Sequence, residues 1–305
     1  MKAAVAHKKT LSRGFKKYIF LATILIVPVA HFIVFWGAVN FNSILMAFRR
    51  ETDAGIVATF DHFKEVFRLL THGELRRYTV NTLLTWSFLT VFLLPWGFLA
   101  TYFLYKKIPL AGAWRTMLFL PTILPTLAMV TVFVNLIYAD GPIGKLWALA
   151  GNSTPNFLTD SRFSRYTVLV YIFWTNFGGS FVLFSGAMSR VPKEVLESAR
   201  IDGAGMWVEL LRIILPLCWP TFSMLLLLNI ATLFVASGPL LFLSGVGGAH
   251  RADTISFWIF TRVSTGNSRM MSEASAMGLL CTAALFPLVV LTRWGLGKVY
   301  ADVEF

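Results

Sequence analysis

Charged side chains are scarce in this 305-residue chain, and cysteine is almost absent. Asp, Glu, Lys and Arg make up only 14% of the residues, whereas 56% are hydrophobic. A water-soluble chain with this balance would expose large apolar patches and aggregate. The two cysteines, Cys218 and Cys281, are too few for a disulfide framework or a CxxC metal site. The composition therefore indicates a membrane protein.

Catalytic motifs are also lacking. The five histidines are scattered, and neither an HExxH nor a G-x-S-x-G pattern occurs. Two segments, 141–145 and 294–299, contain Gly-Lys as a phosphate-binding loop does. Neither has the leading glycine or the Ser/Thr that follows the lysine in such a loop. We therefore predict that the chain is not an enzyme and binds no metal or cofactor of its own.

Six long apolar runs are present, and each is about as long as a helix that crosses a bilayer. They cover 18–40, 80–104, 116–138, 167–188, 214–236 and 274–292. The short alternating segments of a membrane β-barrel do not occur. The first run is long for a signal-peptide core and has no small-residue cleavage site, so we expect it to be retained. The pattern predicts an all-α integral membrane protein with six spans.

Lysine and arginine near the span ends predict the orientation. They dominate the N-terminal tail, the 2–3 connection and the segment after the sixth run. We therefore expect both termini and residues 189–212 on the cytoplasmic side. The 40–79 connection carries both signs and is long enough to cross regardless of charge, so we place it outside. The net charge of +12 is then a topology signal, because no basic helix with interleaved aromatics suggests nucleic-acid binding.

The outer ends of the first and last spans divide the chain into three parts. We expect a cytoplasmic tail at 1–17, a six-helix permease domain at 18–296 and a second tail at 297–305. Within the runs, the polar side chains are almost all uncharged, and His31 is the one clear ionisable group. Such groups often only join helices. Trp174, Asn176 and Asn229 are nevertheless candidates to line a path for a neutral, hydroxylated solute.

Residues 191–216 form a charged stretch between two apolar runs. Pro192 suits the first position of a helix, and Gly203 is placed to end that helix with a positive φ. We expect Val195 and Ala199 to share one face of it. A second helix is predicted from Met206 to Pro216. The stretch is either a plain solvated connection or a docking element for another protein.

Its spacing resembles the "EAA" loop of permeases in ATP-binding-cassette importers. The matching residues are Glu197, Ser198, Ala199, Asp202, Gly203, Ala204, Ile213, Leu215 and Pro216. Ser198 replaces the usual alanine, and both residues are small. Segments 81–86, 115–143, 241–263 and 273–280 also resemble carbohydrate permeases of the maltose and glycerol-phosphate type. We call residues 189–212 the EAA loop.

The resemblance implies a type I importer permease fold and a set of partners. These are a second permease subunit, two cytoplasmic ATPase subunits that bind ATP and magnesium, an extracytoplasmic solute-binding protein and the lipid bilayer. The nine motif residues would couple ATP hydrolysis to transport of a sugar or oligosaccharide across a bacterial or archaeal cytoplasmic membrane. The alternatives are a secondary transporter or channel, which would need no ATPase, and a membrane enzyme.

Overall fold

A computed structural model describes residues 13–52, 55–151, 155–235, 243 and 252–299. These residues are almost entirely helical, apart from one short hairpin. Five helical stretches are long and apolar enough to cross a membrane, and a bent pair of helices makes a sixth. The expected all-helical architecture with six spans is thereby confirmed.

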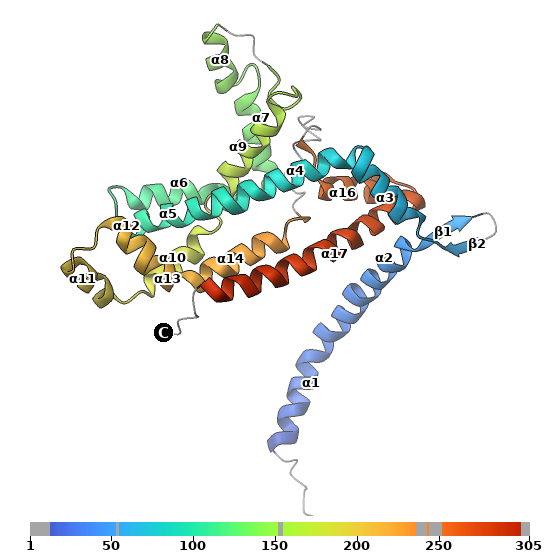
Figure 1. The fold of residues 1–305 in the computed structure, drawn as a ribbon, viewed down its shortest axis with the longest axis horizontal. Helices are drawn as coiled ribbons and strands as arrows, with labels where there is room; N and C mark the ends of the chain where they lie inside the picture. Colours follow the sequence, from blue (N-terminus) through green and yellow to red (C-terminus); the bar gives the residue numbers. More distant parts are fainter. Residues whose placement is uncertain (1–12, 53–54, 152–154, 236–242, 244–251, 300–305) are drawn as a thin grey trace, which may run out of the picture.

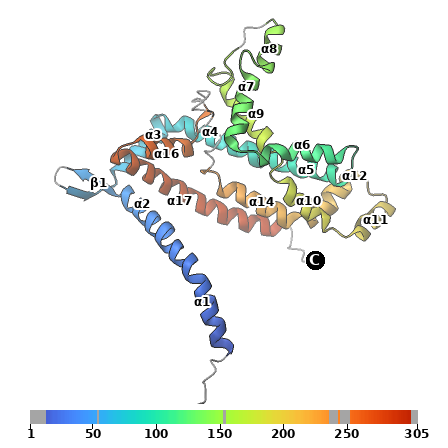
Figure 2. The same cartoon turned by 180° about the vertical axis from the view of Figure 1, so that it is seen from behind.

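The first span has an N-terminal part that stands apart from the other helices and a C-terminal part that packs against the last span (Figures 1 and 2). It consists of α1 (Arg13–His31), the π-helical segment η1 (Phe32–Ala38) and α2 (Val39–Ala47). Its most apolar stretch has no buried residue. The connection that follows contains the antiparallel strands β1 (Arg49–Thr52) and β2 (Gly55–Ala58), with Arg49 paired to Ala58, and then α3 (Asp61–His72).

Span two is continuous, whereas the third run is broken. Span two, Leu75–Tyr105, comprises α4 (Leu75–Ser87), the π-helical η2 (Phe88–Leu93) and α5 (Leu94–Tyr105). The single helix expected over 116–138 is divided into α6 (Ala111–Ile123) and α7 (Thr126–Ile137). Leu124 is extended at φ −73° and ψ 146°, as a residue before proline prefers, and Pro125 then starts the second helix.

The rest of the chain contains the remaining three spans. α8 (Pro142–Leu149) is followed by α9 (Ser164–Asn176) and α10 (Phe181–Ser189), which form the fourth. The loop helices are α11 (Lys193–Ile201), α12 (Met206–Glu209), the π-helical η3 (Leu210–Ile214) and α13 (Leu215–Leu217). The last helices are α14 (Trp219–Ala231), α16 (Ile255–Thr265) and α17 (Ser268–Val299). Because α1 begins at Arg13 and α17 ends at Val299, both predicted tail boundaries fall inside helices.

Three clusters of buried side chains hold the helices together. One joins α7 to α9 around Phe133 and Tyr171, and another joins α2, α4, α16 and α17 around Trp258. The third joins α5 and α10 to the loop helices around Tyr102, Phe184 and Leu210. The EAA loop therefore packs against the membrane-spanning helices through buried side chains of its own.

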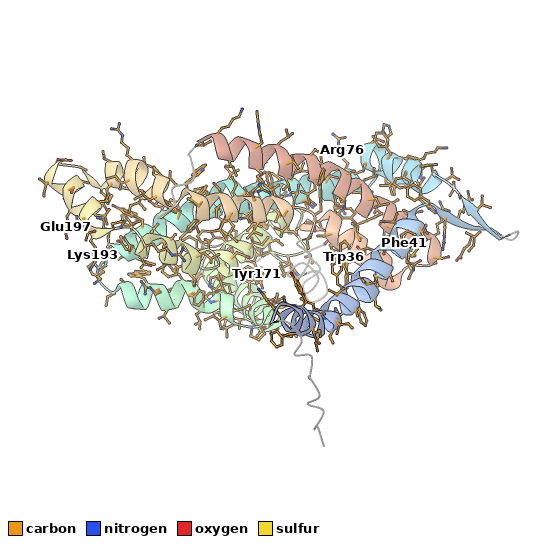
Figure 3. The ribbon with its side chains drawn as sticks, turned by 90° about the horizontal axis from the view of Figure 1, so that it is seen from below. Trp36, Phe41, Arg76, Tyr171, Lys193 and Glu197 are labelled. Carbon is orange, nitrogen blue, oxygen red and sulfur yellow. The ribbon has the colours of Figure 1, made fainter. Side chains whose placement is uncertain are left out.

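The EAA loop and the 40–79 connection lie at opposite ends of the molecule. In Figure 1, α11 is at one end and the β1–β2 hairpin at the other, and the C-terminal end of α17 lies on the side of α11. Figure 3 shows Lys193 and Glu197 together at one end, with Arg76 towards the other. This separation agrees with the expectation that the two loops face opposite sides of a membrane.

Candidate functional site

The first half of the EAA loop is a short helix closed by a left-handed glycine. α11 starts after Pro192 and ends at Ile201, and Gly203 has φ +78°. The Gly203 amide donates to the Arg200 carbonyl at 3.1 Å, and the Ala204 amide donates to the Ala199 carbonyl at 2.9 Å. These two bonds form a Schellman motif, in which the residue after the helix takes a positive φ. The predicted helix stop at Gly203 is confirmed.

α11 has one face in the core and one face in the open. Leu196 and Ala199 are buried, with 5% and 9% of their surface exposed. Glu197 and Ser198 are exposed, and Ile201 is 87% exposed. Val195 and Ala199 lie four residues apart in α11 and share a side of it as expected, but Val195 is 41% exposed and Leu196 fills the core instead.

The second half of the loop leads into the fifth span through a bend. Met206 to Leu217 is continuous helix, as predicted, and meets α14 at an angle of 73°. Ile213, Leu215 and Pro216 are half-buried at this approach. Before the bend, Trp207 and Leu211 are 55% and 53% exposed. Ile201, Glu197, Asp202 and Gly203 in the first half of the loop are exposed as well.

A second feature is a hollow between the spans with both polar and apolar side chains in its wall. A cavity of about 340 Å³ is lined by Asn176, Gly179 and Ser180 from the fourth span, Asn229 and Thr232 from the fifth, and Leu89, Leu93 and Leu94 from span two. A neighbouring cavity of about 230 Å³ shares Asn176 and Gly179 and adds Thr122, Thr126 and Thr175. The predicted residues Asn176 and Asn229, 53 positions apart in sequence, thus line one space.

The two amides are held in the same way. Asn176 Nδ2 donates to the Ile172 carbonyl at 3.1 Å, and Asn229 Nδ2 donates to the Leu225 carbonyl at 3.0 Å. Within the described part of the chain, neither amide oxygen accepts a hydrogen bond. Each is therefore oriented by its own helix with an acceptor left for a donor in the hollow. No charged side chain lines either cavity among the residues that the structure describes.

Trp174, the third residue predicted for the solute path, does not line the hollow with Asn176 and Asn229. It lies against the cluster around Phe133, with the two ring centroids 6.1 Å apart, and lines neither cavity. Ser180 and Thr232, which do line the hollow, were missed from the sequence. The available signal was their closeness in sequence: Ser180, directly before α10, is four residues after Asn176, and Thr232, directly after α14, is three residues after Asn229.

The rest of the predicted site is not described in full. Of the glycine-rich segment 241–251, only Leu243 lies within the described residues, so the resemblance there has no structural account. After it, Asn81 Nδ2 donates to the Asp253 carbonyl at 2.9 Å. The Ile255 amide donates to Thr82 at 2.9 Å, which ties this segment to α4. In the described residues, no group of three His, Cys, Asp or Glu is placed to hold a metal ion.

Comparison with known proteins identifies the family. The model of the family "binding-protein-dependent transport system inner membrane component" matches residues 93–302, which include the EAA loop and most lining residues of the hollow. The chain belongs to this family. It is a transport permease, and the predicted absence of an enzymatic role is consistent with that.

Several relatives of this permease are named as sugar transporters. It is 26% identical over 158 residues to the lactose transport system permease protein LacF of Rhizobium radiobacter. It is 26% identical over 204 residues to the galactooligosaccharides transport system permease protein GanP of Bacillus subtilis. These alignments cover 50% and 63% of this chain and 53% and 48% of the relatives. The permease therefore spans about half the length of the curated relatives it matches.

A solved structure shares the whole fold. A bacterial ABC transporter involved in the import of the acidic polysaccharide alginate contains a chain that matches with a TM-score of 0.82 at 20% identity. The match covers 94% of this permease and 98% of that chain. The same transporter in complex with an alginate pentasaccharide-bound periplasmic protein matches equally well, with a TM-score of 0.82. This likeness confirms the type I importer permease fold.

Proposed function

We propose that this permease is a membrane-spanning subunit of an ATP-driven importer for a neutral sugar or oligosaccharide. Two ATPase subunits bind and hydrolyse ATP with magnesium in the cytoplasm, and an extracytoplasmic binding protein delivers the solute. A second, different permease subunit completes the pathway. The observation that carries the proposal is the EAA loop, with a stable turn at Gly203 and an exposed surface at one end of the molecule.

The geometry of the loop suits docking into a groove of an ATPase subunit. α11 is anchored by Leu196 and Ala199, so its exposed face is presented at a defined position. The exposed residues of α11, the turn after it and α12 include the acidic Glu197 and Asp202 and the apolar Ile201 and Trp207, which suit hydrogen bonds and apolar burial against a partner. A plain solvated connection needs neither the apolar surface nor the core anchors. All nine motif residues are assigned to this coupling role.

The hollow supports the choice of a neutral solute. Asn176, Asn229, Ser180 and Thr232 supply hydrogen-bond acceptors and donors, and leucine side chains supply the apolar wall. An acidic saccharide would have to leave water without a compensating positive charge, which is costly in a low-dielectric site. GanP and LacF are named for galactooligosaccharides and lactose, which are neutral sugars. Trp174 has no place in this path.

Copurification tests the proposal. The tagged permease, expressed with its partner subunits, should retain an ATP-hydrolysing subunit in detergent. Ser198→Trp adds a large side chain to the exposed face of α11 and should reduce that retention about tenfold or more, as for a truncated interface hot spot. Ser43→Trp is the matched control, because Ser43 is exposed on α2 at the opposite end.

A permease that carries solute without any associated ATPase would instead be a secondary transporter or channel. Equal retention with Trp at position 198 would show that the EAA loop is not the docking surface. Binding of a panel of neutral and acidic oligosaccharides to the cognate binding protein then tests the solute class. Selective binding of an acidic saccharide would contradict a neutral path while leaving the importer in place.

A further inference from the structure

A buried ion pair joins the EAA loop to the end of span two. Glu209, the last residue of α12, has only 4% of its side chain exposed. Lys106, directly after α5, places its Nζ 2.5 Å from Glu209 Oε1 and 2.6 Å from Oε2. The lysine side chain is 24% exposed, and its Nζ also lies 5.6 Å from the centre of the Tyr102 ring.

A second polar contact runs parallel to the pair. The Tyr102 hydroxyl, on a side chain that is fully buried, donates to the Met206 carbonyl at 3.3 Å. Met206 and Glu209 are the two ends of α12, so this helix is attached to α5 at both ends. Leu210 and Ile214 continue the contact in the surrounding apolar cluster.

Apolar packing alone would hold these helices together but would allow them to slide. A buried ion pair often adds little net stability, because desolvation offsets the attraction. What it supplies is a short, directional contact that fails sharply when either partner is displaced or neutralised. An ion pair within an otherwise apolar cluster therefore fits a role in fixing one helix against another.

Span two carries this contact to the hollow. Leu89, Leu93 and Leu94, which line the 340 Å³ cavity together with Asn229, belong to the continuous span Leu75–Tyr105, and Lys106 directly follows it. A displacement of α12 at the end of the molecule would thus move the wall of the hollow through a single helical element. We propose that the Lys106–Glu209 pair is a strut that makes the EAA loop and span two move as one body. The inference rests on the coupling role proposed for the loop, and Lys106 and Glu209 are positioning residues in it.

Distances between spin labels test the strut. Cysteines replace Glu194 on α11 and Val91 on span two, both exposed, in a background with Cys218→Ala and Cys281→Ala. The full complex with its ATPase subunits is measured in nanodiscs with and without a non-hydrolysed ATP analogue and magnesium. The wild-type permease should give one narrow distance that the nucleotide does not change. Glu209→Gln and Lys106→Met should broaden that distance and shift it by several ångströms when the nucleotide binds.

Two further variants separate the strut from simple loss of stability. Lys107→Met is the control, since Lys107 is the exposed neighbour and has no ion pair with any described residue; it should behave as wild type. Exchanging the charges, Lys106→Glu with Glu209→Lys, should restore the narrow distance. A purely structural role would lower the yield of both disruptive single variants, Glu209→Gln and Lys106→Met, and leave the distance unchanged.

Three results would contradict the strut. The distance between the labels in the wild-type permease could shift when the nucleotide binds, or the single variants could keep the wild-type distance. The charge exchange could also fail to restore the narrow distance. Failure of the proposed function looks different, because no ATPase subunit would then copurify. The strut is still tested in that case, since Glu209→Gln should broaden the distance in the permease without nucleotide.

Discussion

Two glycines in the EAA loop show how much one φ angle decides. Gly203 has φ +78° and closes the Schellman motif, whereas Gly205 has φ −70° before α12. A Cβ added at either position would meet no other atom of the chain within 4 Å. The positions therefore differ in backbone conformation and not in available space. Only Gly203 requires glycine, because a left-handed conformation costs other residues about 1 kcal/mol.

Gly203→Val or Gly203→Asp should abolish coupling without removing the protein from the membrane. The strain falls on the turn that sets the angle between α11 and α12, while the spans keep their own packing. ATPase activity and solute uptake are measured in reconstituted complexes, and membrane levels by immunoblotting. Gly205→Ala is the matched control and should transport normally. Tightly coupled uptake with Val at position 203 would contradict the coupling role.

Glu197→Lys should act in the same direction as the Gly203 variants but more weakly, because Glu197 is exposed.

The two asparagine side chains that line the hollow give a second prediction at the level of single residues. Asn229→Leu and Asn176→Leu each remove a side chain whose oxygen is free to accept from a solute. Loss of one such bond is worth roughly 1 to 1.5 kcal/mol, or about tenfold in the solute concentration for half-maximal uptake. Asn40→Leu is the control, since its amide donates to the Trp36 carbonyl at 2.6 Å in the first span, away from the hollow. An unchanged half-maximal concentration in both hollow variants would remove these residues from the path.

At the scale of elements, a charged cluster joins three helices at the other end of the molecule. Glu273 of α17 has 6% of its side chain exposed and contacts Arg262 of α16 at 2.5 Å and Arg269 at 3.1 Å. Arg262 stacks over the Trp258 ring at 4.5 Å, and the Trp258 indole donates to Glu74 before α4 at 3.1 Å. The cluster fixes α16, which follows the glycine-rich segment, to α17 and α4.

Removing the central acid of this cluster should destabilise the protein. Glu273→Gln leaves two arginines without their shared carboxylate, and breaking such a buried pair costs roughly 3 kcal/mol. We expect a clearly lower midpoint of thermal unfolding in detergent. Glu65→Gln on α3 is the control: Arg68 donates to Glu65 at 2.6 Å and lowers the pKa of that carboxyl, but this pair is exposed. Equal midpoints for the two variants would show that the cluster is not a structural clamp.

At the scale of the whole molecule, the two ends differ in what they present. One end carries the EAA loop, with the end of α17 on the same side, and the other carries the β1–β2 hairpin and α3 (Figure 1). In a bilayer we expect these ends to face opposite aqueous compartments. The lysine and arginine distribution then predicts that the EAA loop faces the cytoplasm.

Single cysteines test this orientation in a background that lacks Cys218 and Cys281. Thr10→Cys, Leu110→Cys and Gly205→Cys should resist an impermeant thiol reagent added outside whole cells and react after permeabilisation. Lys64→Cys, exposed on α3 in the 40–79 connection, is the control that should react from outside. Labelling of position 205 from outside would overturn the orientation, because the EAA loop then never meets a cytoplasmic ATPase.

The sequence by itself determined the features that depend on neighbouring residues. Apolar run length determined the number of spans. The spacing from Glu197 to Pro216 specified the EAA loop, and the need for a left-handed residue after α11 specified Gly203. The break at Pro125 had a local signal as well, but run length concealed it. Only the tertiary structure decided which distant residues meet. Asn176 shares its hollow with Asn229, Lys106 pairs with Glu209, and Trp174 packs against the cluster around Phe133 instead of lining the hollow. These outcomes follow from the packing of whole helices against one another, and residue spacing along the chain carries no direct record of that packing.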